Sequence, residues 1–298
     1  MASDLTPVVR TIEAGQGRQL EVLTAGPADG VPLVFHNGTP SGLVAFAPMV
    51  ATAADRGLRT VMYGRPGYGA STAQRGRRVA DAAADVATVL DDLGAGEFVT
   101  AGWSGGGPHA LATAVLLAGR CRAAATIAGV APYEADGLDW LAGMGEENIE
   151  EFAATVKGEA ALTEFLHEQA AQLRGVTADQ VAASLGDLVG DADKAVITGE
   201  FASYLAAAFT AALSSGIEGW RDDDFAFASD WGFPLGAPVP VAIWQGDQDR
   251  MVPFAHGQWL AGHVPGATAH LIPGAGHLSL IDQFEMIVDD LVSASGIR

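Results

Sequence analysis

The segment Gly102-Trp103-Ser104-Gly105-Gly106 holds a serine inside a Gly-x-Ser-x-Gly pattern. An apolar run at 98–101 precedes it and predicts a buried strand, and the alanine- and leucine-rich residues 108–117 after it predict a helix. Strand, Gly-x-Ser-x-Gly and helix in this order are typical of a nucleophile elbow, a tight turn that strains the backbone of its serine. The flanking glycines let the strand and the helix approach closely. We therefore expect Ser104 to present its hydroxyl at the positive end of the helix, where an acyl-transfer enzyme needs a nucleophile.

The composition is that of a folded, acidic protein. The chain has 298 residues, of which 49% are hydrophobic and 17% charged, so a large core can form in one α/β domain or in a domain with an insertion. The formal net charge is −20. A surface this acidic repels phosphate backbones and anionic membranes, so we expect neither nucleic acid nor a membrane as a partner. An oligomer is compatible with these features, but they do not specify one.

The chain carries no sign of export, of a membrane span or of a bound cofactor. Its single cysteine, Cys121, excludes an internal disulfide, and residues 1–5 lack the basic and apolar regions of a signal peptide. Arg120 and Arg122 interrupt the longest apolar stretch well short of the ~18–20 residues that a membrane helix needs. No Cys/His/Asp cluster has zinc-like spacing, and no phosphate-binding loop or dinucleotide fingerprint occurs. We expect a cytoplasmic protein without a cofactor or a metal.

Apolar runs alternate with helical segments along most of the chain. This alternation predicts an α/β fold with a mostly parallel central sheet flanked by helices. Strands are expected at 31–36, 58–63, 98–101, 123–128, 239–244 and 269–272, and helices at 77–93, 108–117, 254–263 and 278–294.

The alternation stops between residues 132 and 232, where the pattern is helical. Helices are expected there at 149–157, 160–173, 178–188 and 200–213. We interpret residues 1–131 and 233–298 as the two parts of a core domain, and residues 132–232 as a helical cap inserted into it. Such a cap would cover the carboxyl edge of the sheet, where ligands bind in open α/β folds.

Partner residues decide whether Ser104 is a nucleophile or merely caps a helix. A serine hydroxyl needs an adjacent base, usually a histidine that a carboxylate orients, and in a nucleophile elbow the chain order is serine, acid, histidine. The strand at 241–244 runs into a turn that contains Asp247 and Asp249, and the strand at 269–272 runs into His277. Either aspartate suits the orienting role by its position alone. The spacing of the three segments favours a catalytic serine.

The chain resembles the α/β-hydrolase fold superfamily, in particular its serine-nucleophile members with a helical cap, and the resemblance spans nearly all of it. It rests on five segments in the expected order: 36–40, 64–69, 102–106, 246–253 and 276–277. The resemblance implies Ser104 as the nucleophile and His277 as the base. In the family pattern the acid is the third residue after the glycine, which selects Asp249 and leaves Asp247 as a turn residue.

The tetrahedral intermediate of acyl transfer needs hydrogen-bond donors for its oxyanion. The backbone N–H of Gly105, directly after the nucleophile, is expected to be one of them. The other is expected from the loop after the strand at 31–36, where the family pattern is His-Gly-x-Pro. This chain reads His36-Asn37-Gly38-Thr39-Pro40, with Asn37 interposed, and alignment on the glycine and the proline makes the N–H of Thr39 the second donor.

Residues near the expected mouth of the pocket suit an uncharged, partly apolar small molecule. Family members that release N-terminal residues from peptides need an acidic anchor for the substrate amine. Glu146, Glu147, Glu150 and Glu151 are available, but we assign them to a solvated helix face. The large apolar side chains expected at the pocket are Phe46, Trp103, Tyr133, Trp140 and Trp231.

These features together predict a serine esterase (EC 3.1.1) that cleaves a carboxylic ester or similar acyl bond through an acyl-enzyme on Ser104. A serine at the elbow argues against the dehalogenases and epoxide hydrolases of the same superfamily, which use an aspartate. Two alternatives keep the same three residues: a cofactor-free perhydrolase or haloperoxidase, and a carbon–carbon bond hydrolase. A further alternative is a ligand-binding protein without enzymatic activity. The fold does not dictate the substrate, and we expect residues 132–232 to determine it.

Overall fold

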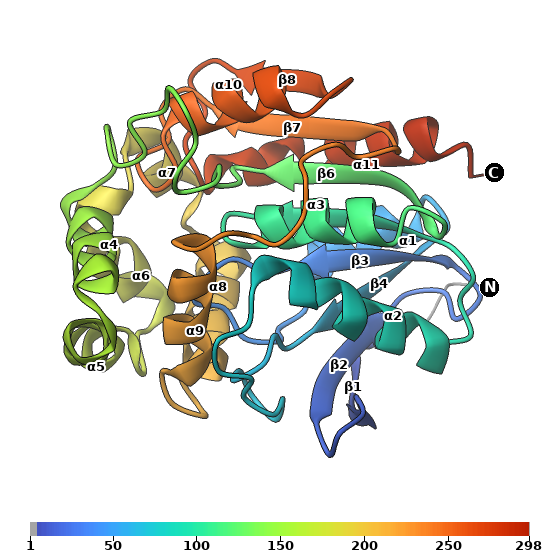
Figure 1. The fold of residues 1–298 in the computed structure, drawn as a ribbon, viewed down its shortest axis with the longest axis horizontal. Helices are drawn as coiled ribbons and strands as arrows, with labels where there is room; N and C mark the ends of the chain where they lie inside the picture. Colours follow the sequence, from blue (N-terminus) through green and yellow to red (C-terminus); the bar gives the residue numbers. More distant parts are fainter. Residues whose placement is uncertain (1–4, 298) are drawn as a thin grey trace.

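The computed structural model describes residues 5–297, and one eight-stranded sheet forms its centre (Figure 1). The strands follow the order β1-β2-β4-β3-β5-β6-β7-β8 across the sheet. All neighbours from β4 to β8 pair in parallel, whereas β1 pairs antiparallel with β2, and β2 with β4. The strands are β1 Val8–Glu13, β2 Gln19–Ala25, β3 Val31–His36, β4 Leu58–Tyr63, β5 Phe98–Trp103, β6 Cys121–Ile127, β7 Val241–Gly246 and β8 Thr268–Ile272.

Helices cover both faces of the sheet because the central strands are apolar on both sides. Successive strand residues point to opposite faces, so Val34 joins the core under one set of helices and Leu33 joins the core under the other. α2 (Ala82–Asp92), α3 (Gly106–Leu116) and α10 (Phe254–His263) pack on the first face. α1 (Ala47–Ala54) and α11 (Phe284–Ser295) pack on the second. The predicted mostly parallel α/β sheet flanked by helices is therefore confirmed.

Between β6 and β7 the chain forms six helices, called here the inserted helices. Figure 1 shows them gathered beyond the ends toward which the arrows of β6 and β7 point. Two apolar clusters hold them together and against the rest of the chain: the cluster around Leu162 and Leu166 includes Tyr68, and the cluster around Val181 and Val189 includes Leu278. The inserted helices are α4 Glu146–Lys157, α5 Glu159–Leu173, α6 Val181–Ser184, α7 Asp191–Val196, α8 Gly199–Ala212 and α9 Glu218–Phe227.

Several elements differ from the sequence prediction. In place of the single helix expected at 178–188, the chain forms two short 3-10 turns with α6 between them. Gly186 takes a positive φ of 52°, which interrupts the expected helix. The helix expected at 278–294 begins as a 3-10 turn, Ser279–Gln283, before α11. Among the described residues, no helix is long and apolar enough to cross a membrane.

Candidate active site

Ser104 lies in the turn between β5 and α3 and has a left-handed backbone, with φ of 54°. Its N–H donates to the carbonyl of Ile127 at 2.8 Å, which fixes the turn against the neighbouring strand. A side chain at Gly102 would collide with the carbonyl of Gly106, and one at Gly106 would collide with the carbonyl of His36. The strand and the helix meet so closely that only glycine fits at these two positions, as the sequence pattern predicts.

His277 follows β8 and contacts a single carboxylate with its ring. Its Nδ1 lies 2.9 Å and 3.1 Å from the two carboxylate oxygens of Asp249, and the imidazole is 2% exposed. Because a carboxylate only accepts, Nδ1 carries the hydrogen in this contact and leaves Nε2 available as a base. Burial lowers the pKa of His277, but the charge and hydrogen bond of Asp249 and the charge of Asp193 outweigh it, so the pKa is raised above its ordinary value.

The turn after β7 holds Asp249 rigidly. Its Oδ1 accepts the N–H groups of Met251 and Val252 at 2.9 Å and 2.8 Å, and its Oδ2 accepts the amide of Gln245 at 2.9 Å. Asp247 is instead exposed and accepts the N–H of Gly274 at 2.8 Å. The structure thus brings Asp249, and not Asp247, to His277.

Sequence reasoning missed Asp193, a fully buried aspartate on α7. Its carboxylate accepts three consecutive backbone N–H groups, from His277 at 3.1 Å, Leu278 at 2.8 Å and Ser279 at 2.9 Å. A side chain at Gly276 would collide with this carboxylate. No sequence pattern singles out Asp193, because its partners lie more than eighty residues further along the chain.

Thr39 and Gly105 lie against each other beside Ser104. A Cβ added to Gly105 would lie 2.6 Å from the Thr39 hydroxyl oxygen. That hydroxyl donates to Asp223 at 2.8 Å and accepts from Arg65 at 2.9 Å. Within the described chain, neither the N–H of Thr39 nor that of Gly105 donates to a protein acceptor. These two N–H groups, both beside Ser104, can therefore donate hydrogen bonds to an oxyanion that develops there.

Ser104 and His277 open into one cavity of about 170 Å³. The loop Gly38–Ser41 lines it on the side of the sheet. The inserted helices supply its far side, which is largely apolar but includes several polar groups. The helices contribute Glu147, Asn148, Glu151, Phe165, Gln169, Leu173, Tyr204, Leu205, Phe209 and Trp220, among others, and the segment between α6 and α7 contributes Leu185 and Leu188.

One of the five large apolar residues predicted for the pocket, Trp103, lines this cavity. Phe46 instead packs against Phe201 and Tyr204, with ring centroids 5.4 Å and 5.1 Å apart. Tyr133 and Trp140 pack against each other, also at 5.1 Å; Trp140 is buried in the core of the first sheet face, and the half-buried Tyr133 packs against that core.

Trp231 stacks on Phe233 and is buried in the same core. The prediction was therefore wrong for Phe46, Tyr133, Trp140 and Trp231. These rings are large enough to fill the interior, and their closeness in sequence to the site loops did not place them at the cavity.

The glutamates of α4 divide into two sets. Glu146 and Glu150 are exposed, as expected of a solvated face, but Glu147 and Glu151 line the cavity. Glu151 accepts the indole N–H of Trp220 at 2.6 Å.

Glu151 also pairs with the buried carboxyl of Asp224 on α9. Burial raises the pKa of Glu151, and burial together with Glu151 raises the pKa of Asp224 well above its ordinary value. Burial thus disfavours the charged form of both carboxyls, and the neighbouring Glu151 does so further for Asp224.

His109 lies one turn into α3 and plays a structural part. Its Nδ1 lies 2.8 Å from the carbonyl oxygen of Gly105, and burial lowers its pKa to about 3. It therefore stays neutral at physiological pH and braces the start of α3. Among the described residues, no group of three or more metal-ligating side chains comes together.

A family model described as the alpha/beta hydrolase fold matches residues 31–284, which include Ser104, Asp249 and His277. The chain belongs to the α/β-hydrolase family. This membership relates the chain to hydrolytic enzymes. The strand order of the sheet and the turn at Ser104 agree with it.

Several known α/β hydrolases are similar, over most of their own length, to this chain. It is 27% identical, over 79% of its chain and 88% of the relative's, to a pimeloyl-[acyl-carrier protein] methyl ester esterase from Aromatoleum aromaticum. Among solved structures, the esterase EaEST from Exiguobacterium antarcticum superposes with a TM-score of 0.69 at 19% identity, covering 97% of this chain and 100% of the other. A bromoperoxidase from Bacillus anthracis superposes at 0.68 and 21% identity, covering 96% and 99%. At these identities the structural likeness shows a common fold.

Proposed function

We propose that this α/β hydrolase is a serine esterase that cleaves a carboxylic ester or similar acyl bond. The observation that carries the proposal is the strained Ser104, which opens into one cavity with a His277 whose other ring nitrogen is bound to the buried Asp249. The curated relative, named as a methyl ester esterase, supports the same reaction class.

The proposed reaction uses these groups in turn. His277 Nε2 takes the proton of the Ser104 hydroxyl while its oxygen attacks the acyl carbon, and Asp249 stabilises the imidazolium that forms. The N–H groups of Gly105 and Thr39 stabilise the negative charge on the former carbonyl oxygen. His277 then gives its proton to the leaving alcohol, and an acyl group remains on Ser104. Water, deprotonated by His277, releases the carboxylic acid and restores the serine.

The cavity supports a small, uncharged and partly apolar substrate. Its far wall includes leucine, phenylalanine, tyrosine and tryptophan side chains, which favour an apolar group. Glu147 and Glu151 place two carboxyl groups in the same wall, which disfavour an anionic substituent nearby. The inserted helices thus act as a substrate-selecting cap, corresponding to residues 132–232, and the enzyme works on small molecules in the cytoplasm without a cofactor.

Labelling with a fluorophosphonate tests the nucleophile. We expect a single adduct on Ser104 by mass spectrometry, turnover of neutral short-chain esters, and loss of both in Ser104→Ala. An intact wild-type protein without an adduct would refute the assignment. Oxidation of bromide with peroxide, or cleavage of a dienoic diketone, in place of ester turnover would instead favour one of the two alternative reactions.

A further inference from the structure

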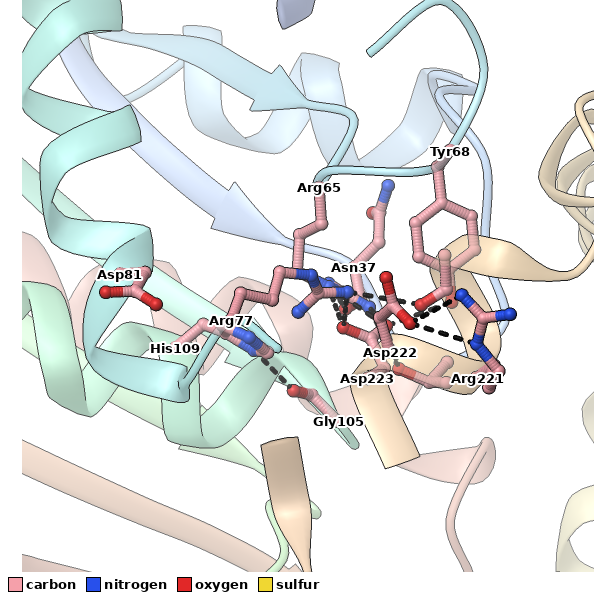
Figure 2. A network of polar contacts seen from close by, with 12 residues as sticks. Asn37, Arg65, Tyr68, Arg77, Asp81, Gly105, His109, Arg221, Asp222 and Asp223 are labelled. Atoms are coloured by element: carbon pink, nitrogen blue, oxygen red, sulfur yellow. Dashed lines mark hydrogen bonds and ion pairs between the residues drawn. The ribbon is translucent and has the colours of Figure 1, made fainter. Parts of the chain in front are cut away.

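A buried polar network lies beneath the loop that supplies Thr39 (Figure 2). We call Arg65, Tyr68, Arg77 and Asp223 the Arg65 network. Figure 2 shows the side chains of Arg65, Tyr68 and Arg77 directed toward Asp223. Arg65 and Arg77 are 4% and 5% exposed, and Asp223 is fully buried.

Arg65, just after β4, holds three consecutive residues of this loop with one guanidinium group. Its Nη1 donates to the carbonyl of Asn37 at 2.5 Å, and its Nη2 donates to the carbonyl of Gly38 and to the hydroxyl of Thr39, both at 2.9 Å. A planar guanidinium fixes the direction of each of these bonds, which a lysine ammonium cannot do. The loop is therefore fixed in position and in orientation.

Asp223, on α9, holds the arginine in turn. Arg65 donates to its carboxylate through Nη2 at 2.6 Å and Nε at 3.0 Å, and Arg77 donates at 2.6 Å. The hydroxyls of Tyr68 and Thr39 add bonds of 2.9 Å and 2.8 Å. Burial raises the pKa of Asp223, but the two guanidinium groups outweigh it and hold that pKa far below its ordinary value, so the carboxylate stays charged.

The same helix contacts both donors of the candidate oxyanion hole. Besides the bond from Thr39 to Asp223, the ring of Phe227 lies so close to Gly105 that an added Cβ would lie 2.8 Å from it. At its other end α9 packs on the loop after β4, where a Cβ on Gly219 would collide with the ring of Tyr68. α9 is thus fitted to the core at the point where the two N–H groups meet.

Buried ion pairs of this kind contribute little net stability, because the cost of removing charges from water offsets their attraction. We propose that Arg65 and Asp223 are positioning residues of the oxyanion hole. They hold the N–H of Thr39 beside that of Gly105, so the geometry of the two donors depends on how α9 packs against the core. The inference rests on the proposed esterase function and goes beyond it, because it ties an inserted helix to the rate of the chemical step.

The test compares Arg65→Lys, which keeps the charge and loses the planar fork, with Arg18→Lys, the same change at the Arg18–Asp85 ion pair of 2.8 Å. Three quantities are measured: kcat and KM for a neutral ester, the rate constant for fluorophosphonate labelling of Ser104, and the melting temperature. For Arg65→Lys we expect kcat and the labelling rate to fall by about 10- to 100-fold with KM within about threefold, since a small misplacement of a catalytic group has this effect. Arg18→Lys should change the melting temperature alone. Asp223→Asn should act in the same direction as Arg65→Lys.

The outcomes separate this inference from the proposed function. A folded Arg65→Lys protein with wild-type kcat and labelling rate overturns the positioning role, as does an equal loss of kcat in Arg18→Lys. A wild-type protein that labels on Ser104 but hydrolyses no ester refutes the esterase function alone, and the labelling rates of the variants still decide the inference. A wild-type protein that does not label refutes both.

Discussion

Asp249 is held by four hydrogen-bond donors. Two backbone N–H groups, one amide and the imidazole of His277 all donate to its two oxygens, and it is 5% exposed. Each donor restricts the carboxylate to one orientation. Asp247, two residues earlier, instead accepts from the side chain of Gln248 and from the N–H of Gly274 in the turn after β8. This difference supports Asp249, rather than Asp247, as the proposed orienting acid.

Asp249→Asn should lower kcat by roughly 10³- to 10⁴-fold, because an amide nitrogen facing Nδ1 favours the wrong imidazole tautomer. Asp247→Asn is the matched control and should stay within about threefold of wild type, the usual size of a surface effect. Steady-state kinetics with a neutral ester measure both. Equal losses in the two variants would contradict the assignment of Asp249.

The activity should fall on the acidic side as His277 becomes protonated. A general base works only in its neutral form, and the raised pKa of His277 moves protonation to higher pH. We therefore expect the midpoint of the acid limb of kcat/KM above the ordinary histidine value of about 6.5, with about a tenfold loss per pH unit below it. A pH–rate profile measures the midpoint. A midpoint below the ordinary value would show that burial, rather than Asp249, dominates.

For single residues, the sequence predicts the roles that follow from residue type and from the order of the segments along the chain. Ser104, Asp249 and His277 follow predicted strands, and parallel strands bring their carboxyl ends to one edge. Asp193 and Asp223 were not predicted, since their roles depend on where the inserted helices dock. The aromatic residues expected at the pocket show the same limit, because a large apolar side chain fits a core as well as a cavity.

Among the elements, α7 is short but contacts the loop of His277 directly. Its Asp193 caps the three N–H groups that begin at His277, and its charge helps to raise the histidine pKa. A six-residue helix has little stability of its own, so this contact and apolar packing keep it in place.

Asp193→Asn leaves fewer acceptors for these N–H groups and removes a charge near His277. We expect a loss of about 1–3 kcal/mol in unfolding free energy, a lower kcat/KM, and an acid limb shifted to lower pH. Chemical denaturation and pH–rate profiles test this. Asp191→Asn, at an exposed position of the same helix, should leave all three quantities unchanged. An unshifted acid limb would show that Asp193 acts on stability alone.

The elements predicted well are those with a strong apolar pattern. β3 and β4 begin and end as expected, since both are buried. β1 was not predicted, because five of its six residues are exposed and it pairs along one edge only. The helix expected at 178–188 breaks because local glycine geometry prevails over a helical composition.

The charge of the whole molecule, −20, should affect which substrates arrive at the site. At low salt, kcat/KM for an ester with a free carboxylate should be lower than for the matched neutral methyl ester. Salt screens this repulsion, with a Debye length of about 10 Å at 0.1 M, so added NaCl should raise the anionic value. The neutral ester is the control and should not respond. Equal salt responses for the two esters would contradict long-range repulsion.

The inserted helices contribute two carboxylates to the core, Asp193 behind His277 and Asp223 behind Thr39. An engineer who transplants this segment from another hydrolase to change the substrate range would remove both. The transplanted segment would then have to supply an acceptor for the N–H groups that begin at His277 and an anion for Arg65. Otherwise the candidate active site of the chimera would be impaired. Selectivity in this protein is therefore changed more safely by substituting single cavity-lining side chains than by exchanging the segment.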